Sequence, residues 1–197
     1  MQNNINITRP SSNEVSKYLK LWNSLENYTL QESSLNKLFL KTYPFNTDLD
    51  DVLIKVCALN DFYSTNIFSP FTVAKHIVSL KIDDHLAKDN LDIVNRISLV
   101  RMNRDKSINF YSFATKYCSH HKPTTYPIYD SYVEKILMYF KKKDSFAEFS
   151  RKDLRAYKIF REILLKFREY YELEEFNLKQ IDQYLWQLGK EYFPRKY

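Results

Sequence analysis

The stretch NFYSFATKYCSHHKPTTYPIYDSY, residues 109–132, predicts two consecutive helices joined by a turn that contains two prolines. Apolar residues recur at helical spacing in its first half: Phe110, Phe113, Ala114 and Tyr117. Lys116 lies beside this stripe, with His120 one turn further on the same side. Asp130 stands at the N-cap or in the first turn of the second helix. The prolyl turn therefore predicts that Lys116 and Asp130 share one cleft.

The rest of the chain also has a helical pattern. Gly189 is the single glycine among 197 residues, so glycine-rich phosphate loops and tight hairpin turns are not expected. Helix-start signals occur in three places: Thr29 with Glu32, Asn177 with Gln180, and Ser69 before Pro70. We therefore predict an all-α chain with helices over residues 13–26, 30–42, 48–62, 70–80, 90–99, 108–120, 131–142, 151–171 and 178–192.

The length and composition predict one helical domain over residues 1–197, compact or divided into two lobes around a cleft. Hydrophobic residues make up 44% of the chain, enough for a sizeable core. The first residues do not resemble a signal peptide and no apolar run is long enough to span a bilayer, so we expect a cytoplasmic protein with no membrane partner. Two cysteines are too few for a disulfide framework, and no residue cluster predicts a metal site.

The net charge of +6 is concentrated between residues 139 and 168. A basic stripe is predicted on the helix over residues 151–171, with three lysines in the loop before it. The candidate DNA-binding residues are Lys141, Lys142, Lys143, Arg151, Arg155 and Lys158. A solvated helix face is the alternative interpretation of the same charges.

Lys116 and Asp130 are the candidate catalytic pair. An amine nucleophile has to be partly neutral near pH 7, and burial in an aromatic pocket favours that form. A carboxylate at a helix N-terminus can activate the amine or stabilise a cationic transition state. Taken alone, the pattern also fits a lysine that reaches solvent and an aspartate that only caps a helix.

The strings TK at 115–116 and YPIYD at 126–130 resemble the helix-hairpin-helix (HhH-GPD) DNA glycosylase superfamily, particularly its 8-oxoguanine glycosylase branch. The resemblance covers residues 112–133 and implies a two-lobed helical fold with a central cleft that receives a flipped nucleotide. It implies that Lys116 is the Schiff-base nucleophile at the sugar C1′ and that Asp130 assists base departure. Two departures are evident: no glycine precedes Lys116 in the hairpin, and the interval from lysine to aspartate is short.

The resemblance also assigns residues around the pair. The cleft would be lined by two segments, residues 59–68 and 109–133. Tyr63 would stack on the flipped base, and Asn60, Thr65 or Asn66 would read its edge. From its position one turn from Lys116, and independently of the resemblance, His120 would contact DNA phosphate or tune the pKa of the lysine. The alternatives are an ordinary helix end with a packed tyrosine and a solvated histidine.

These observations predict a DNA glycosylase that excises a modified or damaged base from double-stranded DNA, with associated AP lyase activity. A looser similarity of SFATKYC and YPIYD to phage-defence glycosylases extends the prediction to hypermodified cytosine, such as glucosylated hydroxymethylcytosine. We expect a monomer without cofactor or metal. One alternative is a glycosylase in which Asp130 activates water and Lys116 only positions DNA. Another is a non-catalytic helical module that binds DNA or a protein partner.

Overall fold

The computed structural model describes residues 6–103 and 106–194, and these form helices with one short hairpin. The predicted all-α class is therefore confirmed. The helices are α1 (Ser12–Ser24), α2 (Glu26–Lys37), α3 (Leu49–Tyr63), α4 (Pro70–Ser79), α5 (Ile82–Ala87), α6 (Asp92–Ser98), α7 (Tyr111–His121), α8 (Ser131–Asp144), α9 (Tyr157–Tyr170) and α10 (Leu178–Tyr192). A π-helical turn, Leu38–Thr42, follows α2, and a 3-10 turn, Asp153–Arg155, precedes α9. Strands β1 (Leu99–Arg101) and β2 (Ser107–Asn109) pair antiparallel.

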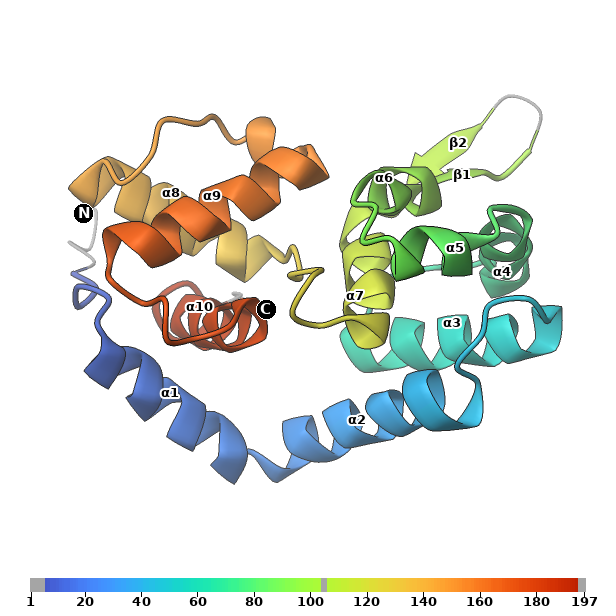
Figure 1. Ribbon diagram of the computed structural model, residues 1–197, viewed down its shortest axis with the longest axis horizontal. Coiled ribbons are helices and arrows are strands. Elements are labelled where there is room, and N and C mark those ends of the chain that lie inside the picture. The colour runs from blue at the N-terminus through green and yellow to red at the C-terminus, as the bar shows by residue number, and fades with distance from the viewer. Residues whose placement is uncertain (1–5, 104–105, 195–197) are drawn as a thin grey trace.

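The helices gather in two groups (Figure 1). The terminal lobe consists of α1, α8, α9 and α10, and the central lobe consists of α2 to α7 with the hairpin. Helix α10 packs against both α1 and α8, while α3 packs on α4 and α6 on α7. The chain thus leaves the terminal lobe after α1 and returns to it through the segment between α7 and α8. None of the helices in the described ranges has the length and apolar character needed to cross a membrane.

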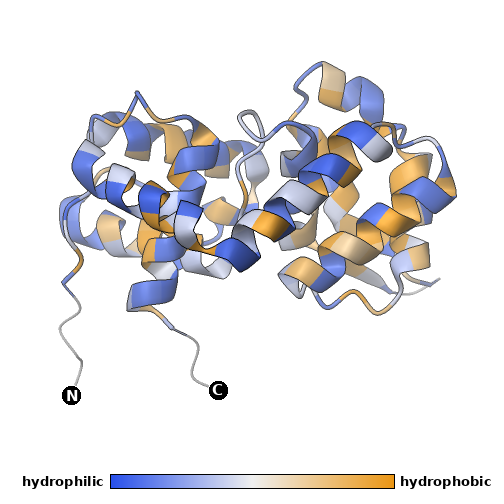
Figure 2. Ribbon diagram, turned by 90° about the horizontal axis from the view of Figure 1, so that it is seen from below, coloured by the Kyte–Doolittle hydropathy of each residue, from blue (hydrophilic) through white to orange (hydrophobic). Residues whose placement is uncertain are grey.

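Apolar stripes on the helices form the core. Figure 2 shows hydrophobic and hydrophilic residues alternating around the helices of both lobes. In and before α9 the predicted apolar stripe is buried throughout: Leu154, Tyr157, Phe160, Ile163, Leu164 and Phe167. Spacings of three and four residues place these side chains on one face, so burying that face ties α9 to the rest of its lobe.

Two of the three predicted helix starts are confirmed. Asn177 and Gln180 form a reciprocal capping box at α10, and Ser69 precedes Pro70 at the first turn of α4. Thr29 lies inside α2, which begins at Glu26, and its hydroxyl donates to the Glu26 carbonyl at 3.0 Å. The expected start at Thr29 is wrong because a mid-helix threonine can satisfy its hydroxyl on the preceding turn.

Four other segments differ from the prediction. Helix α5 and the hairpin were not predicted, and the helix expected over residues 90–99 is the shorter α6. The helix expected over residues 151–171 is divided at Ala156, whose backbone is extended. Before this break the Asp153 carboxylate accepts the backbone N–H of Ser150 at 2.7 Å and its hydroxyl at 2.8 Å. Short polar side chains offer the backbone such local turns in place of a helix.

The lone glycine sets how closely α8 and α10 approach. A Cβ atom at Gly189 would lie 2.5 Å from the Cβ of Tyr132 and 2.8 Å from its carbonyl oxygen. No side chain fits in that space, so glycine is required for close packing. Because Tyr132 lies two residues after Asp130, this contact also fixes the start of α8.

Candidate active site

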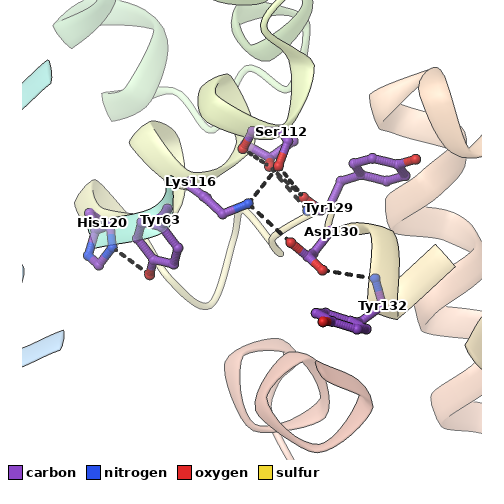
Figure 3. Close-up of polar contacts among 8 residues, drawn as sticks. Tyr63, Ser112, Lys116, His120, Tyr129, Asp130 and Tyr132 are labelled. Carbon is purple, nitrogen blue, oxygen red and sulfur yellow. Dashed lines mark hydrogen bonds and ion pairs between the residues drawn. The ribbon is translucent and has the colours of Figure 1, made fainter. Parts of the chain in front are cut away.

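Lys116 and Asp130 are in contact. Lys116 lies on α7 with only 3% of its surface exposed, and its Nζ is 3.6 Å from Oδ2 of Asp130. Asp130 caps α8, where its carboxylate accepts the N–H of Tyr132 at 2.8 Å. The Lys116 ammonium also donates to the Ser112 hydroxyl at 2.6 Å (Figure 3). The structure therefore brings together the two residues selected from the sequence.

Two hydroxyl groups on α7 determine where Asp130 lies. Thr115 Oγ1 accepts the backbone N–H of Tyr129 at 3.1 Å and donates to the Ser112 carbonyl at 2.9 Å. Ser112 Oγ donates to the Tyr129 carbonyl at 3.2 Å. Both polar groups that Tyr129 carries on its backbone are thus tied to α7, and Asp130 follows immediately. The sequence signal for this role is the pair of hydroxyl residues three apart on the helix that carries Lys116.

Tyr63 lies beside Lys116, and His120 contacts Tyr63. Nζ of Lys116 lies 5.2 Å from the centre of the Tyr63 ring, and the Tyr63 hydroxyl is 3.0 Å from His120 Nε2. Burial lowers the pKa of His120 to about 3, and the nearby charge of Lys179 adds to this effect. Burial raises the pKa of Tyr63 to about 12. A neutral imidazole therefore holds a neutral phenol against the ammonium group.

A cavity of about 270 Å³ opens at the Lys116–Asp130 pair and is lined by residues from both lobes. The segments predicted to line it contribute Phe62, Tyr63, Ser64, Lys116, Ile128, Asp130 and Tyr132. Helices α1, α2 and α10 supply the remainder of the lining, which was not predicted from the sequence. We call this cavity the central cleft.

One end of the central cleft is aromatic. The rings of Trp22 and Tyr28 are stacked with centres 5.9 Å apart, and Trp186 meets Tyr28 edge-on at 5.1 Å. The Lys190 ammonium lies 4.7 Å from the Trp186 ring and 4.8 Å from the Tyr28 ring. Aromatic faces with a nearby cation suit a flat, electron-rich ligand.

Charged groups lie next to this aromatic cluster in the central cleft, where Trp22 Nε1 donates to Glu32 at 3.2 Å. Lys179 forms an ion pair with Glu32 at 2.8 Å, and Asp182 lies one turn along the same helix. Among the described residues, Oδ1 of Asp182 has no hydrogen-bond partner. Burial raises the pKa of Asp182 to about 7; the negative charges of Asp130 and Glu32 act in the same direction, and Lys179 and Lys116 oppose it. The described part of the chain contains no group of three or more His, Cys, Asp or Glu arranged for a metal ion.

Three of the predicted substrate-binding residues are placed differently. Asn60 Oδ1 accepts the Thr65 hydroxyl at 2.8 Å and the Ile67 N–H at 2.9 Å, while its Nδ2 donates to the Ile67 carbonyl at 3.2 Å. Among the described residues that line the central cleft, Asn60, Thr65 and His120 do not appear, whereas Tyr63 does. Asn60 and Thr65 fix a loop, and His120, 4% exposed, is too buried for the phosphate contact we expected.

Most of the predicted DNA-binding lysines make intramolecular contacts. Lys141 donates to a backbone carbonyl in the loop that follows α8, and Lys143 donates to a carbonyl in the first described segment at 2.6 Å. Lys158 forms an ion pair with Asp92 of α6 at 2.8 Å, across the two lobes. Lys142 is exposed on α8. Three of these four lysines therefore already have intramolecular partners.

The two predicted arginines converge near the candidate catalytic pair. Arg151 Nε lies 3.3 Å from one oxygen of Glu134, and the Arg155 guanidinium lies 3.6 Å from the other. Arg155 also lies over the Tyr129 ring at 5.0 Å. The arginines occupy a turn and the 3-10 turn before α9, so the predicted helical stripe is wrong. Glu134, one turn from Asp130, nevertheless keeps two exposed guanidinium groups beside the start of α8.

The fold and the site define the class: a helical protein in which a buried lysine and a helix-capping carboxylate meet at a cleft between two lobes. The chain belongs to the family described as HI_0787_N: N-terminal domain, whose model matches residues 14–125. It is 48% identical over 151 residues to a protein of Haemophilus influenzae described as "Uncharacterized protein", and the alignment covers 76% of this chain and 72% of the relative. No solved structure matches the chain. The family match includes Lys116 and ends before Asp130.

Proposed function

We propose that this chain is a DNA glycosylase of the helix-hairpin-helix type, which flips a modified or damaged base out of duplex DNA and cleaves its N-glycosidic bond. The observation that carries the proposal is the 3.6 Å contact between Lys116 Nζ and Asp130 Oδ2 at the central cleft. A lysine held in an aromatic, largely buried setting and oriented by a hydroxyl and a carboxylate has the arrangement of an activated amine nucleophile.

In the proposed reaction the neutral amine of Lys116 attacks C1′ of the flipped nucleoside. The bond from C1′ to the base nitrogen breaks, and the base leaves with the bonding electron pair. The proton that the lysine nitrogen loses balances the proton that the departing base gains. Asp130 stabilises the positive charge that develops on the sugar. Ring opening then gives an imine between Lys116 and C1′, and β-elimination from this imine nicks the strand.

The aromatic end of the central cleft supports a nucleobase as the ligand. Trp22, Tyr28 and Trp186 offer ring faces and edges for stacking, with Lys190 beside them. The similarity of the SFATKYC and YPIYD strings to phage-defence glycosylases is the basis for proposing a hypermodified cytosine in phage DNA as the particular substrate. Such an enzyme would act as a monomer in the cytoplasm.

Borohydride trapping on duplex DNA with a natural abasic site tests the covalent mechanism. The reductant converts the imine to a stable amine, so wild-type protein should become cross-linked to the DNA. Lys116→Ala should abolish the cross-link. Lys20→Ala is the control and should be trapped as wild type is, because this exposed lysine of α1 is not among the described residues that line the central cleft. Equal trapping by Lys116→Ala and wild type would exclude Lys116 as the nucleophile.

A non-catalytic DNA-binding or partner-binding module is the second candidate, favoured by the absence of glycine before Lys116. It predicts salt-dependent DNA binding with neither base release nor trapping. A glycosylase that uses Asp130 and water predicts a different combination of results. The wild type would release the base without ever being trapped, and Asp130→Asn would stop base release.

A further inference from the structure

The Ser112 hydroxyl lies closer to the Lys116 amine than the Asp130 carboxylate does. Lys116 Nζ is 2.6 Å from Ser112 Oγ, within hydrogen-bond distance, and 3.6 Å from Asp130 Oδ2, beyond it. Ser112 precedes Lys116 by one turn of α7, so the two side chains lie on the same face of the helix. The hydroxyl therefore holds the amine by a hydrogen bond, whereas the carboxylate acts on it through its charge.

The single hydrogen of the Ser112 hydroxyl is already used. Ser112 Oγ donates it to the Tyr129 carbonyl at 3.2 Å, in the segment that leads into α8. A hydroxyl carries one hydrogen and two lone pairs, so only its lone pairs remain for Lys116. Ser112 can therefore accept an N–H from the lysine, and it does not donate to the lone pair of a neutral amine.

Ser112 lies behind the amine as seen from the ligand side. Lys116 and Asp130 line the central cleft, and Ser112 is not among the described residues that do. Figure 3 shows the Lys116 amine joined to both Ser112 and Asp130. A neutral amine has two N–H groups and one lone pair. Because Ser112 accepts one N–H and the charge of Asp130 attracts the other, the lone pair is turned towards the central cleft.

We propose that Ser112 is a positioning residue, which holds one N–H of the neutral Lys116 amine so that its lone pair faces the reacting carbon in the central cleft. This inference rests on the proposed function, in which Lys116 is the attacking amine, and it assigns the group that orients the attack. A fixed direction of attack removes rotational freedom before the reaction begins. Ser112 takes no proton and forms no covalent bond, because its hydrogen stays on the Tyr129 carbonyl.

Reductive methylation tests this orientation without DNA. The neutral amine adds to formaldehyde and water leaves to give an imine, which takes a hydride from cyanoborohydride and a proton from solvent to become a methylamine. Peptide mass spectrometry gives separate rates for Lys116 and for Lys190, which lines the same cleft and is the internal reference. Rates from about pH 6 to about pH 10 separate the rate constant of the neutral amine from its fraction.

Ser112→Ala should lower the rate constant of the neutral Lys116 amine about fivefold or more relative to Lys190, because the lone pair is no longer directed. Loss of a hydrogen-bond acceptor raises the neutral fraction of an amine, so a lower rate constant is not a protonation effect. Ser112→Thr retains the hydroxyl and should recover most of the rate constant. Ser112 is half-buried, so the added methyl group can be accommodated.

Thr115→Val is the matched control. It also removes a hydroxyl bond between α7 and Tyr129, but it leaves Ser112 in contact with Lys116. Its rate constant at Lys116 should stay within about twofold of wild type. An unchanged or higher rate constant in Ser112→Ala would overturn the proposal. An equal decrease in Thr115→Val would also overturn it, because the effect would then come from the position of Tyr129.

The two proposals fail in distinguishable ways, because methylation involves neither DNA nor a base. If the Ser112 result holds while trapping on abasic duplex DNA fails, the amine is oriented but does not attack C1′, and only the proposed covalent mechanism is refuted. If the wild type is trapped through Lys116 while Ser112→Ala is methylated as wild type is, only the role of Ser112 is refuted.

Discussion

Replacing Thr115 by valine should disturb the position of Asp130 without changing any charge. Valine keeps the shape of threonine but lacks the hydroxyl that accepts the Tyr129 N–H at 3.1 Å. Thr115 is fully buried and Tyr129 is 4% exposed, so water cannot take over this bond. An unsatisfied buried donor costs about 1–3 kcal/mol, which corresponds to a decrease in thermal midpoint of roughly 2–12 °C for a chain of this size.

Calorimetry and denaturant titration measure the stability change, and borohydride trapping on abasic duplex DNA measures the effect on the site. Trapping by Thr115→Val should be slower than by wild type, because the Asp130 carboxylate is no longer held beside Lys116. Thr115→Ser retains the hydroxyl and should recover most of the stability and the trapping rate. Wild-type stability in Thr115→Val would refute the role assigned to this bond. A destabilised variant with unchanged trapping would refute its link to Asp130.

Three further predictions concern packing, DNA contact and pH. Gly189→Ala should lower the free energy of unfolding by about 1–3 kcal/mol in denaturant titrations, because the added Cβ would lie 2.5 Å from the Cβ of Tyr132. Arg151→Ala combined with Arg155→Ala should weaken duplex binding and reduce the slope of log affinity against log salt by about 0.9 for each phosphate that is no longer neutralised, read by anisotropy. The Asp182 pKa is about 7 in the folded chain and about 3.9 when unfolded, so ionisation favours unfolding and stability should fall as pH rises from about 4 to about 7. Asp182→Asn should remove that slope in denaturant titrations across this pH range.

Each of these predictions has a contradicting result. Wild-type stability of Gly189→Ala would mean that α8 and α10 separate at no cost. For the arginines, Lys20→Ala on α1 is the control, because it also removes one positive charge at one site. If Lys20→Ala lowers duplex affinity as much per charge removed as the double arginine variant does, the effect is general electrostatics. A pH slope that persists unchanged in Asp182→Asn would assign it to other groups.

Much of the fold follows from local signals in the sequence. The apolar spacing before and within α9 predicted the buried stripe, and Asn177 with Gln180 predicted the start of α10. The prediction differs from the structure where the local sequence pattern is short or is compatible with two structures. Strands of three residues are too short to show an alternating pattern, and Asp153 closes a turn where a helix would otherwise continue.

The candidate site was only partly predictable for a similar reason. The spacing of Lys116 and Asp130 on consecutive helices makes them plausible as a pair, and the resemblance over residues 112–133 makes them the leading candidates. Asn60 and Thr65 were expected in the cleft, and instead bind their own loop, since a polar side chain near a helix end can satisfy either its own backbone or a ligand. Sequence spacing alone does not show whether such a side chain binds its own backbone or a ligand.

The helical character of this chain, and one lysine and one aspartate as candidates for a functional pair, follow from the amino-acid sequence. Helical periodicity depends only on residues close together in the sequence, and the scarcity of glycine is a matter of composition, so neither requires knowledge of long-range contacts. The surroundings of that pair depend on how distant helices pack together. Trp22 of α1, Glu32 of α2 and Asp182 of α10 reach the central cleft because the chain returns to its first lobe at α8 and packs α10 against α1. Periodicity tells which face of a helix is buried, but the packing of distant helices decides what that face meets.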